Sequence, residues 1–134
     1  MSNPITLDVI NLNSIYTGQS TFALDATGDK LGWVVTAPVA VTVDRIAVCY
    51  DSKTGTPPTY AYSLYGITSA GAPDTTILGA TNNATATHAP TAISNDTFHE
   101  LTLGESASFS AGDKFAIVIE YSSGTISGAN MASY

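Results

Sequence analysis

The chain has 134 residues, of which 44% are hydrophobic and 11% are charged, and its formal net charge is −7 at pH 7. This length suits one domain with a core of its own. The composition excludes an intrinsically disordered chain, which would combine low hydrophobicity with many charges. Eleven acidic residues against four basic ones repel a phosphate backbone, so nucleic acid is not expected as a direct partner.

The N-terminal residues and the cysteine content indicate where the protein is made. Residues 1–4 lack the basic region and apolar core of a signal peptide, and no apolar run is long enough to span a bilayer. Cys49 is the single cysteine, so no intrachain disulfide can form, and we interpret it as a small buried hydrophobe. We therefore expect a protein made in a cytoplasm, without a membrane partner.

Strand patterns dominate the first half of the chain. Apolar residues alternate with polar ones at every second position, as in strands with one solvent-facing side, and no window keeps helical spacing. The predicted strands are, in chain order, residues 5–9 (with Ile5, Leu7 and Val9 on one side), 19–24, 31–35, 39–43 and 46–50. A turn is predicted at residues 25–29, and the break at Asp44 and Arg45 indicates a bulge or a corner between two sheets.

The second half continues the same pattern. After an exposed loop at residues 53–58, strands are predicted at residues 60–64, 98–103 and 115–121. Turn clusters are predicted at 69–74 and, after residues 106–111, at 112–113, and a short apolar pair lies at 77–78. The segment 81–95 is predicted to be a long loop with one edge strand. Residues 115–121 are apolar on both sides, which is typical of a central strand.

Short strands at spacings of about ten residues predict an all-β fold, an antiparallel β-sandwich of jelly-roll or Greek-key type. We expect residues 1–134 to form a single domain with an N-terminal arm (1–14) and a C-terminal tail (122–134). Each of these ends is either an inter-subunit arm that adds a strand to a neighbouring copy or an ordinary strand and a frayed end.

No catalytic constellation is visible, so we predict no enzyme activity and no cofactor. His88 and His99 are the two histidines, and Glu100 next to His99 points to the opposite side of a strand. Asp25, Asp29 and Asp113 are possible calcium ligands, but aspartate in a turn is favoured by turn chemistry alone, and we predict no metal. The two Asn-x-Thr matches are interpreted as chance.

Aromatic residues offer one alternative, a sugar-stacking platform. Trp33, Tyr60, Tyr62 and Tyr65 could cover the apolar side of a pyranose ring, although aromatic residues in alternation are more often core. Tyr65 falls out of phase with the other two tyrosines and is predicted to be the exposed one. The candidate ligand or interface residues are therefore Tyr65, Ile5, Leu7, Val9 and Tyr134.

Several segments together resemble structural proteins of tailed-bacteriophage virions. The resemblance is carried by Ala26-Thr27-Gly28-Asp29-Lys30-Leu31-Gly32-Trp33-Val34-Val35, by Phe98-His99-Glu100-Leu101-Thr102-Leu103 and by Ala111-Gly112-Asp113-Lys114-Phe115-Ala116-Ile117-Val118-Ile119, and it spans residues 20–121. It implies a β-sandwich in a phage particle, either a capsid decoration protein, commonly a trimer on the shell, or a tail or fibre component. The implied partners are further copies of the chain and a major capsid or tail protein, and the implied location is the virion.

Two other functions remain open at this point. The first is a carbohydrate-binding module of a tail fibre or adhesin, which predicts a concave polar site beside Tyr65 or the 53–58 loop. The second, ranked last, is an accessory domain of a secreted hydrolase.

Overall fold

The computed structural model describes residues 23–49, 52–90 and 98–133, and in these ranges every regular element is a β-strand. All strand pairs are antiparallel, which confirms the predicted all-β class. Ile5, Leu7, Val9, Tyr134 and the arm at 1–14 lie outside the described residues.

The largest sheet has β9 and β5 at its centre. β9 (Lys114–Ser123) pairs with β2 (Lys30–Thr36) on one side and with β5 (Thr59–Ile67) on the other. The far edge of β5 is shared by two short strands, β7 (Thr85–His88) and β6 (Pro73–Ile77). β7 is the edge strand predicted within residues 81–95, and β9 is the predicted central strand.

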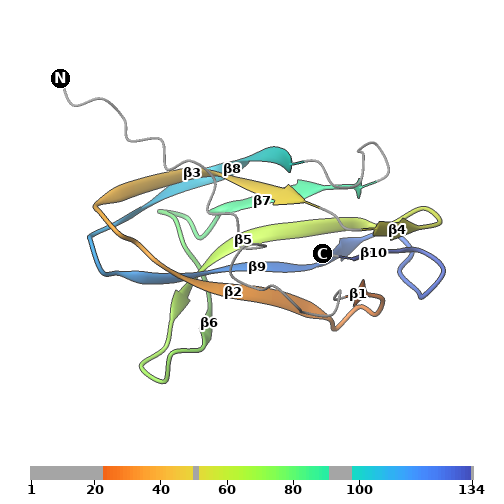
Figure 1. Ribbon diagram of the computed structural model, residues 1–134, viewed down its shortest axis with the longest axis horizontal. Helices are drawn as coiled ribbons and strands as arrows, with labels where there is room; N and C mark the ends of the chain where they lie inside the picture. Colours follow the sequence, from red (N-terminus) through yellow and green to blue (C-terminus); the bar gives the residue numbers. More distant parts are fainter. Residues whose placement is uncertain (1–22, 50–51, 91–97, 134) are drawn as a thin grey trace.

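Two smaller sheets complete the structure. β3 (Val41–Cys49) pairs with β8 (Phe98–Phe109), and this ribbon lies beyond β7 and β5, away from β2 (Figure 1). At one end, β10 (Met131–Ser133) lies between β1 (Ala23–Leu24) and β4 (Ser52–Thr54). The pairs β2–β9, β3–β8 and β5–β7 are nested along the chain, and nested antiparallel ribbons favour a jelly roll over the other predicted types, while the type itself stays a prediction.

The core lies between the large sheet and the β3–β8 ribbon. Tyr60, Tyr62 and Leu64 of β5 are fully buried, and they pack in one cluster with buried side chains of β3 and β8, among them Ile46 and Leu101. Burying each such side chain stabilises the fold by roughly 1.5–3 kcal/mol. Tyr60 and Tyr62 are therefore core residues, as the alternation favoured.

The predicted irregularity at Asp44 and Arg45 is confirmed as a bulge. Val43 lies opposite Ala107, but Arg45 lies opposite Thr102, so the extra residues belong to β8, at positions 103–106. The alternative, a corner between two sheets, is wrong because β3 continues in one sheet through the break. Ile46 and Val48 are buried after the shift, and the segments predicted at 39–43 and 46–50 fall on one strand as far as β3 extends, from Val41 to Cys49.

The bulge in β8 presents Glu105 to the loop before β7. Its carboxylate accepts hydrogen bonds from the hydroxyl and N–H of Thr81, at 2.6 and 2.9 Å, and from the N–H of Asn83 at 3.3 Å. Gly79 lies in the left-handed region at φ 105°, and a Cβ there would collide with this carboxylate. These bonds, led by the Thr81 hydroxyl, hold the pKa of Glu105 below its ordinary value.

The C-terminal segment does not behave as the predicted free arm. Residues 131–133 form β10 within their own chain, and Ala132 is fully buried. Its N–H donates to the hydroxyl of Tyr60 at 3.1 Å, and that hydroxyl donates to the carbonyl of Leu24 at 3.2 Å. The prediction that this segment orders only against a neighbour is wrong for these residues, because a buried tyrosine provides the partner.

Tyr60→Phe should destabilise the fold by about 1–3 kcal/mol, because it leaves a buried N–H and a buried carbonyl without this partner. Urea unfolding measures the loss. The matched control is Tyr121→Phe, which removes an exposed bond to the carbonyl of Gly124 and should cost less. Equal losses for the two variants would contradict the structural role given to Tyr60.

Glu105→Gln should lower the melting temperature at pH 7, because the charged acceptor of three hydrogen bonds is lost. The folded pKa of Glu105 lies below its ordinary value of 4.5, so its contribution is complete above 4.5 and disappears as the pH falls through the folded pKa. The difference between the two proteins should therefore narrow in acid. Calorimetry at several pH values tests this, with Glu100→Gln on the same strand as the control, and a difference independent of pH would refute it.

Candidate interaction surfaces

The outer face of the β3–β8 ribbon is broad and weakly charged. Its exposed side chains are mostly small and neutral, among them Thr42, Ala47, Thr102 and Ser108. The hydroxyls of Thr42 and Ser108 lie 2.9 Å apart and bond to each other. Thr42 and Ser108 therefore lose little on desolvation, because this hydrogen bond is already made within the face.

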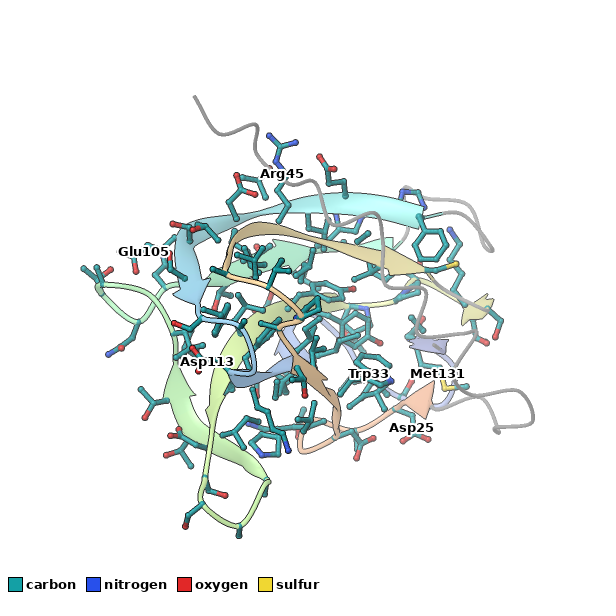
Figure 2. The ribbon with its side chains drawn as sticks, turned by 60° about the vertical axis from the view of Figure 1, so that its left-hand side comes forward. Asp25, Trp33, Arg45, Glu105, Asp113 and Met131 are labelled. Atoms are coloured by element: carbon teal, nitrogen blue, oxygen red, sulfur yellow. The ribbon has the colours of Figure 1, made fainter. Side chains whose placement is uncertain are left out.

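Arg45 and Glu100 pair at the centre of this face, and nearby Asp44 leaves one negative charge there. Arg45 donates from Nη1 to Oε1 of Glu100 at 2.7 Å, and its Nε lies 4.0 Å from Oδ1 of Asp44. Figure 2 shows the Arg45 side chain directed away from the body of the protein. An exposed pair of this kind contributes little to folding stability.

An aromatic residue marks one end of the same face. Phe98 is 47% exposed, and it lies opposite half-buried Cys49 in the strand register. Val34 of β2 and Val39 are the other large exposed apolar residues in the described ranges. A lone exposed apolar residue is ordinary, but an aromatic one at the edge of a near-neutral face is the usual composition of a protein contact.

A polar groove lies at the end of the molecule where β4 and β10 are found. It has a volume of about 460 Å³ and is lined by residues 56–59, residues 123–125, Ala89 and Asn130. None of these residues is charged. The groove is open and presents threonine and serine hydroxyls beside two proline rings.

Backbone contacts fix the shape of this groove. The Asn130 side chain accepts a hydrogen bond from the N–H of Thr56 at 3.0 Å. Gly55 has φ 59°, and a Cβ there would collide with the carbonyl of Ala129, so the loop can approach this closely only with glycine. On the other wall, the Tyr121 hydroxyl donates to the carbonyl of Gly124 at 2.8 Å.

Tyr65 is not the exposed aromatic residue that the sequence predicted. It is 7% exposed, and its hydroxyl donates to Oε1 of Glu120 at 3.1 Å, while Lys30 Nζ lies 2.6 Å from Oε2. Burial, and then the bond to Glu120, raises the pKa of Tyr65. The prediction assumed that one face of this strand meets solvent. The second face of the sheet is buried as well, because Tyr65 packs there in a small cluster with Ala116 and Val118. Its role in ligand binding stays a prediction.

The other aromatic candidate is also part of the core. Trp33 is half-buried against the main cluster, in phase with Leu31 and Val35 as predicted. Figure 2 shows it among the strands, on the same side of the molecule as Met131. The sugar platform of Trp33, Tyr60 and Tyr62 is therefore not available at the surface.

The aspartates considered as metal ligands serve turns. The carboxylate of Asp29 accepts from the N–H groups of Asp25 and Ala26, at 3.1 and 2.9 Å, which holds the pKa of Asp29 below its ordinary value. Asp113 accepts from the N–H of Ser110 at 2.7 Å, in a turn well apart from Asp25 (Figure 2). Within the described ranges, no three His, Cys, Asp or Glu side chains are grouped as metal ligands would be.

The two histidines, eleven positions apart in the sequence, come together in the structure. The rings of His88 on β7 and His99 on β8 are stacked with centroids 6.4 Å apart and planes 18° from parallel. No sequence signal indicated this pair, because it depends on β7 and β8 belonging to different sheets whose edges meet.

Comparison with protein-family models, with curated proteins and with solved structures found no match to this chain. Among the residues that the structure describes, no helix has the length and hydropathy of a membrane span.

Proposed function

We propose that this chain is a non-enzymatic structural protein of a tailed-phage virion, which assembles as an oligomer and decorates or stabilises the capsid. The observation that supports the proposal is the outer face of β3 and β8, where small neutral side chains surround one internal ion pair and end at exposed Phe98. The resemblance of residues 20–121 to virion proteins supports the choice of assembly.

The energetics of this face favour contact over solvation. Bringing two surfaces together costs free energy wherever a charge loses water without gaining a partner. Here Arg45 and Glu100 keep each other as partners, and the remaining exposed groups are mostly short and carry little rotamer entropy. Phe98 then supplies the aromatic anchor that interfaces commonly use.

The edge of the same ribbon offers a second means of attachment. Within the described residues, β3 pairs with β8 alone, so the other edge of β3 carries backbone groups that a strand from another molecule can meet. A closed ring of copies, such as a trimer, uses one face and one edge of every subunit in the same way.

Phe98→Thr should weaken self-association and binding to phage shells by about 2 kcal/mol, roughly thirty-fold in Kd, because it removes the anchor of the interface. Light scattering of the purified protein and co-sedimentation with capsids measure the two effects. Val34→Thr, at an equally exposed apolar position on β2, is the matched control and should leave both unchanged. A strictly monomeric wild-type protein without affinity for shells would overturn the proposal.

A second candidate function, carbohydrate binding by a tail fibre or adhesin, is favoured by the polar groove. Its place beside the 53–58 loop agrees with the position expected for a glycan site. Uncharged hydroxyls suit the hydroxyls of a neutral sugar.

If the groove binds a glycan, Ser123→Ala combined with Thr125→Val should reduce the affinity for each glycan bound by the wild type. Each lost hydrogen bond costs roughly 0.5–1.5 kcal/mol, and the folded shape is kept because both changes preserve size closely. A glycan array followed by titration calorimetry tests this, with Thr102→Val on the β3–β8 face as the control. An array without hits removes the carbohydrate function and leaves the assembly proposal intact.

A further inference from the structure

The rings of His88 and His99 stack on each other at the boundary between two sheets. β7 is an edge strand of the large sheet, β8 belongs to the smaller ribbon, and the two strands lie side by side in the fold (Figure 1). Within the described residues, no backbone ladder joins them. The stacked histidine rings are therefore a side-chain contact at a junction that has no strand pairing.

The His88 ring is held in a position that suits its neutral form. Its Nε2 is buried, and no hydrogen-bond partner for it is found among the described residues. A neutral imidazole can leave this nitrogen unpaired as an acceptor, whereas an imidazolium would place an unpaired N–H and a positive charge there. Proton binding at His88 thus requires the ring to move toward water.

Among the residues that the structure describes, the groups around His88 do not offer a compensating negative charge. On β5 its register partner is Tyr60, whose hydroxyl is engaged by Leu24 and Ala132. On β8 the facing group is His99. Lys53 of β4 donates to the carbonyl of Pro90 at 2.9 Å, two residues beyond His88.

Among the described residues, β3 adds no carboxylate on the inner side. The register partner of His99 is Val48, whereas Cys49 lies opposite Phe98 on the outer face. Glu100 follows His99 but is exposed on the outer face, where it pairs with Arg45. The nearest titratable and charged groups in the described chain are thus tyrosine, histidine, lysine and cysteine.

We propose that His88 and His99 form an acid-sensitive latch, which holds β7 against β8 at neutral pH and releases β7 when His88 takes up a proton. Without the contact to β8, β7 is held by its short pairing with β5, and opening of that pairing uncovers the edge of β5 from Tyr60 to Ser63. That edge can then accept a strand from another molecule. The latch is independent of the proposed function, since it concerns the closing of the fold itself.

The direction of the pH effect follows from burial. Desolvation, and next the charge of His99, lowers the pKa of His88 below its ordinary value of 6.5. The open state therefore binds a proton more readily than the closed state. The latch is complete above pH 6.5, and it weakens as the pH falls below 6.5 and through the lowered pKa of the closed state.

Hydrogen exchange at pH 7.5 and pH 5.0, corrected for intrinsic exchange, tests the latch in the full chain. The amides of β7 and of the facing part of β5 should exchange faster in acid, whereas those of β2 and β9 should not change. NMR titration of the imidazole gives the pKa of His88 directly. For each pH unit by which the pKa of His88 in the closed state lies below 6.5, the equilibrium constant for opening of β7 should be tenfold larger in acid than at neutral pH. The comparison is made at a pH below the pKa values of both the open and the closed state.

His88→Phe keeps an aromatic ring without a titratable group and should make β7 exchange equally at both pH values. His88→Gln serves the same purpose if the phenylalanine variant does not fold. His99→Phe should leave an acid response but raise the pKa of His88, because one positive neighbour is removed. Acid-independent exchange of β7 in the wild type, or an equal acid response in the His88 variants, would overturn the proposal.

Discussion

The pairing of β5 with β9 is the constraint on which the rest of the structure depends. These two strands carry the fully buried Tyr60, Tyr62, Leu64 and Ile119, and they provide the surface on which the β3–β8 ribbon packs. The hydroxyl of Tyr60 extends the same core to the end of the chain by bonding to Leu24 and Ala132. A single aromatic strand thus positions the main core, the small end sheet and the strands that border the groove.

The parts of the fold that depend on local alternation could be predicted from the sequence. Leu31, Trp33 and Val35 share an inward side, Tyr60 and Tyr62 are core, and residues 115–121 belong to a central strand, because side chains on a strand alternate whatever its partners are. The register shift at Asp44 and Arg45 was also visible as a break in the alternation, although the extra residues lie in β8. Each of these signals lies within one segment of chain.

The features that depend on which strands meet could not be predicted. Tyr65 is out of phase with Tyr60 and was expected at the surface, yet the second face of β5 is covered as well. The small and polar residues at the C-terminus are typical of a free tail. Residues 131–133 are nevertheless held in place, because the N–H of Ala132 donates to the hydroxyl of Tyr60, seventy-two positions earlier in the chain. The contact of His88 with His99, and the groove formed by four separate stretches of chain, likewise arise from topology alone.

The acidic character of the chain is compatible with assembly because of where its carboxylates lie. Asp29, Asp113 and Glu105 accept backbone N–H groups in turns and loops, so their charges are tied to the ends and edges of the strands. On the broad faces, Glu100 is paired with Arg45 and Glu120 with Lys30. Two copies with a net charge of −7 repel each other at long range, but over distances beyond about 10 Å physiological salt screens much of that repulsion. At short range, the charges that matter are those on the face itself, and on the β3–β8 face Arg45 offsets one of two carboxylates, so a strongly acidic chain can still present a face of low net charge.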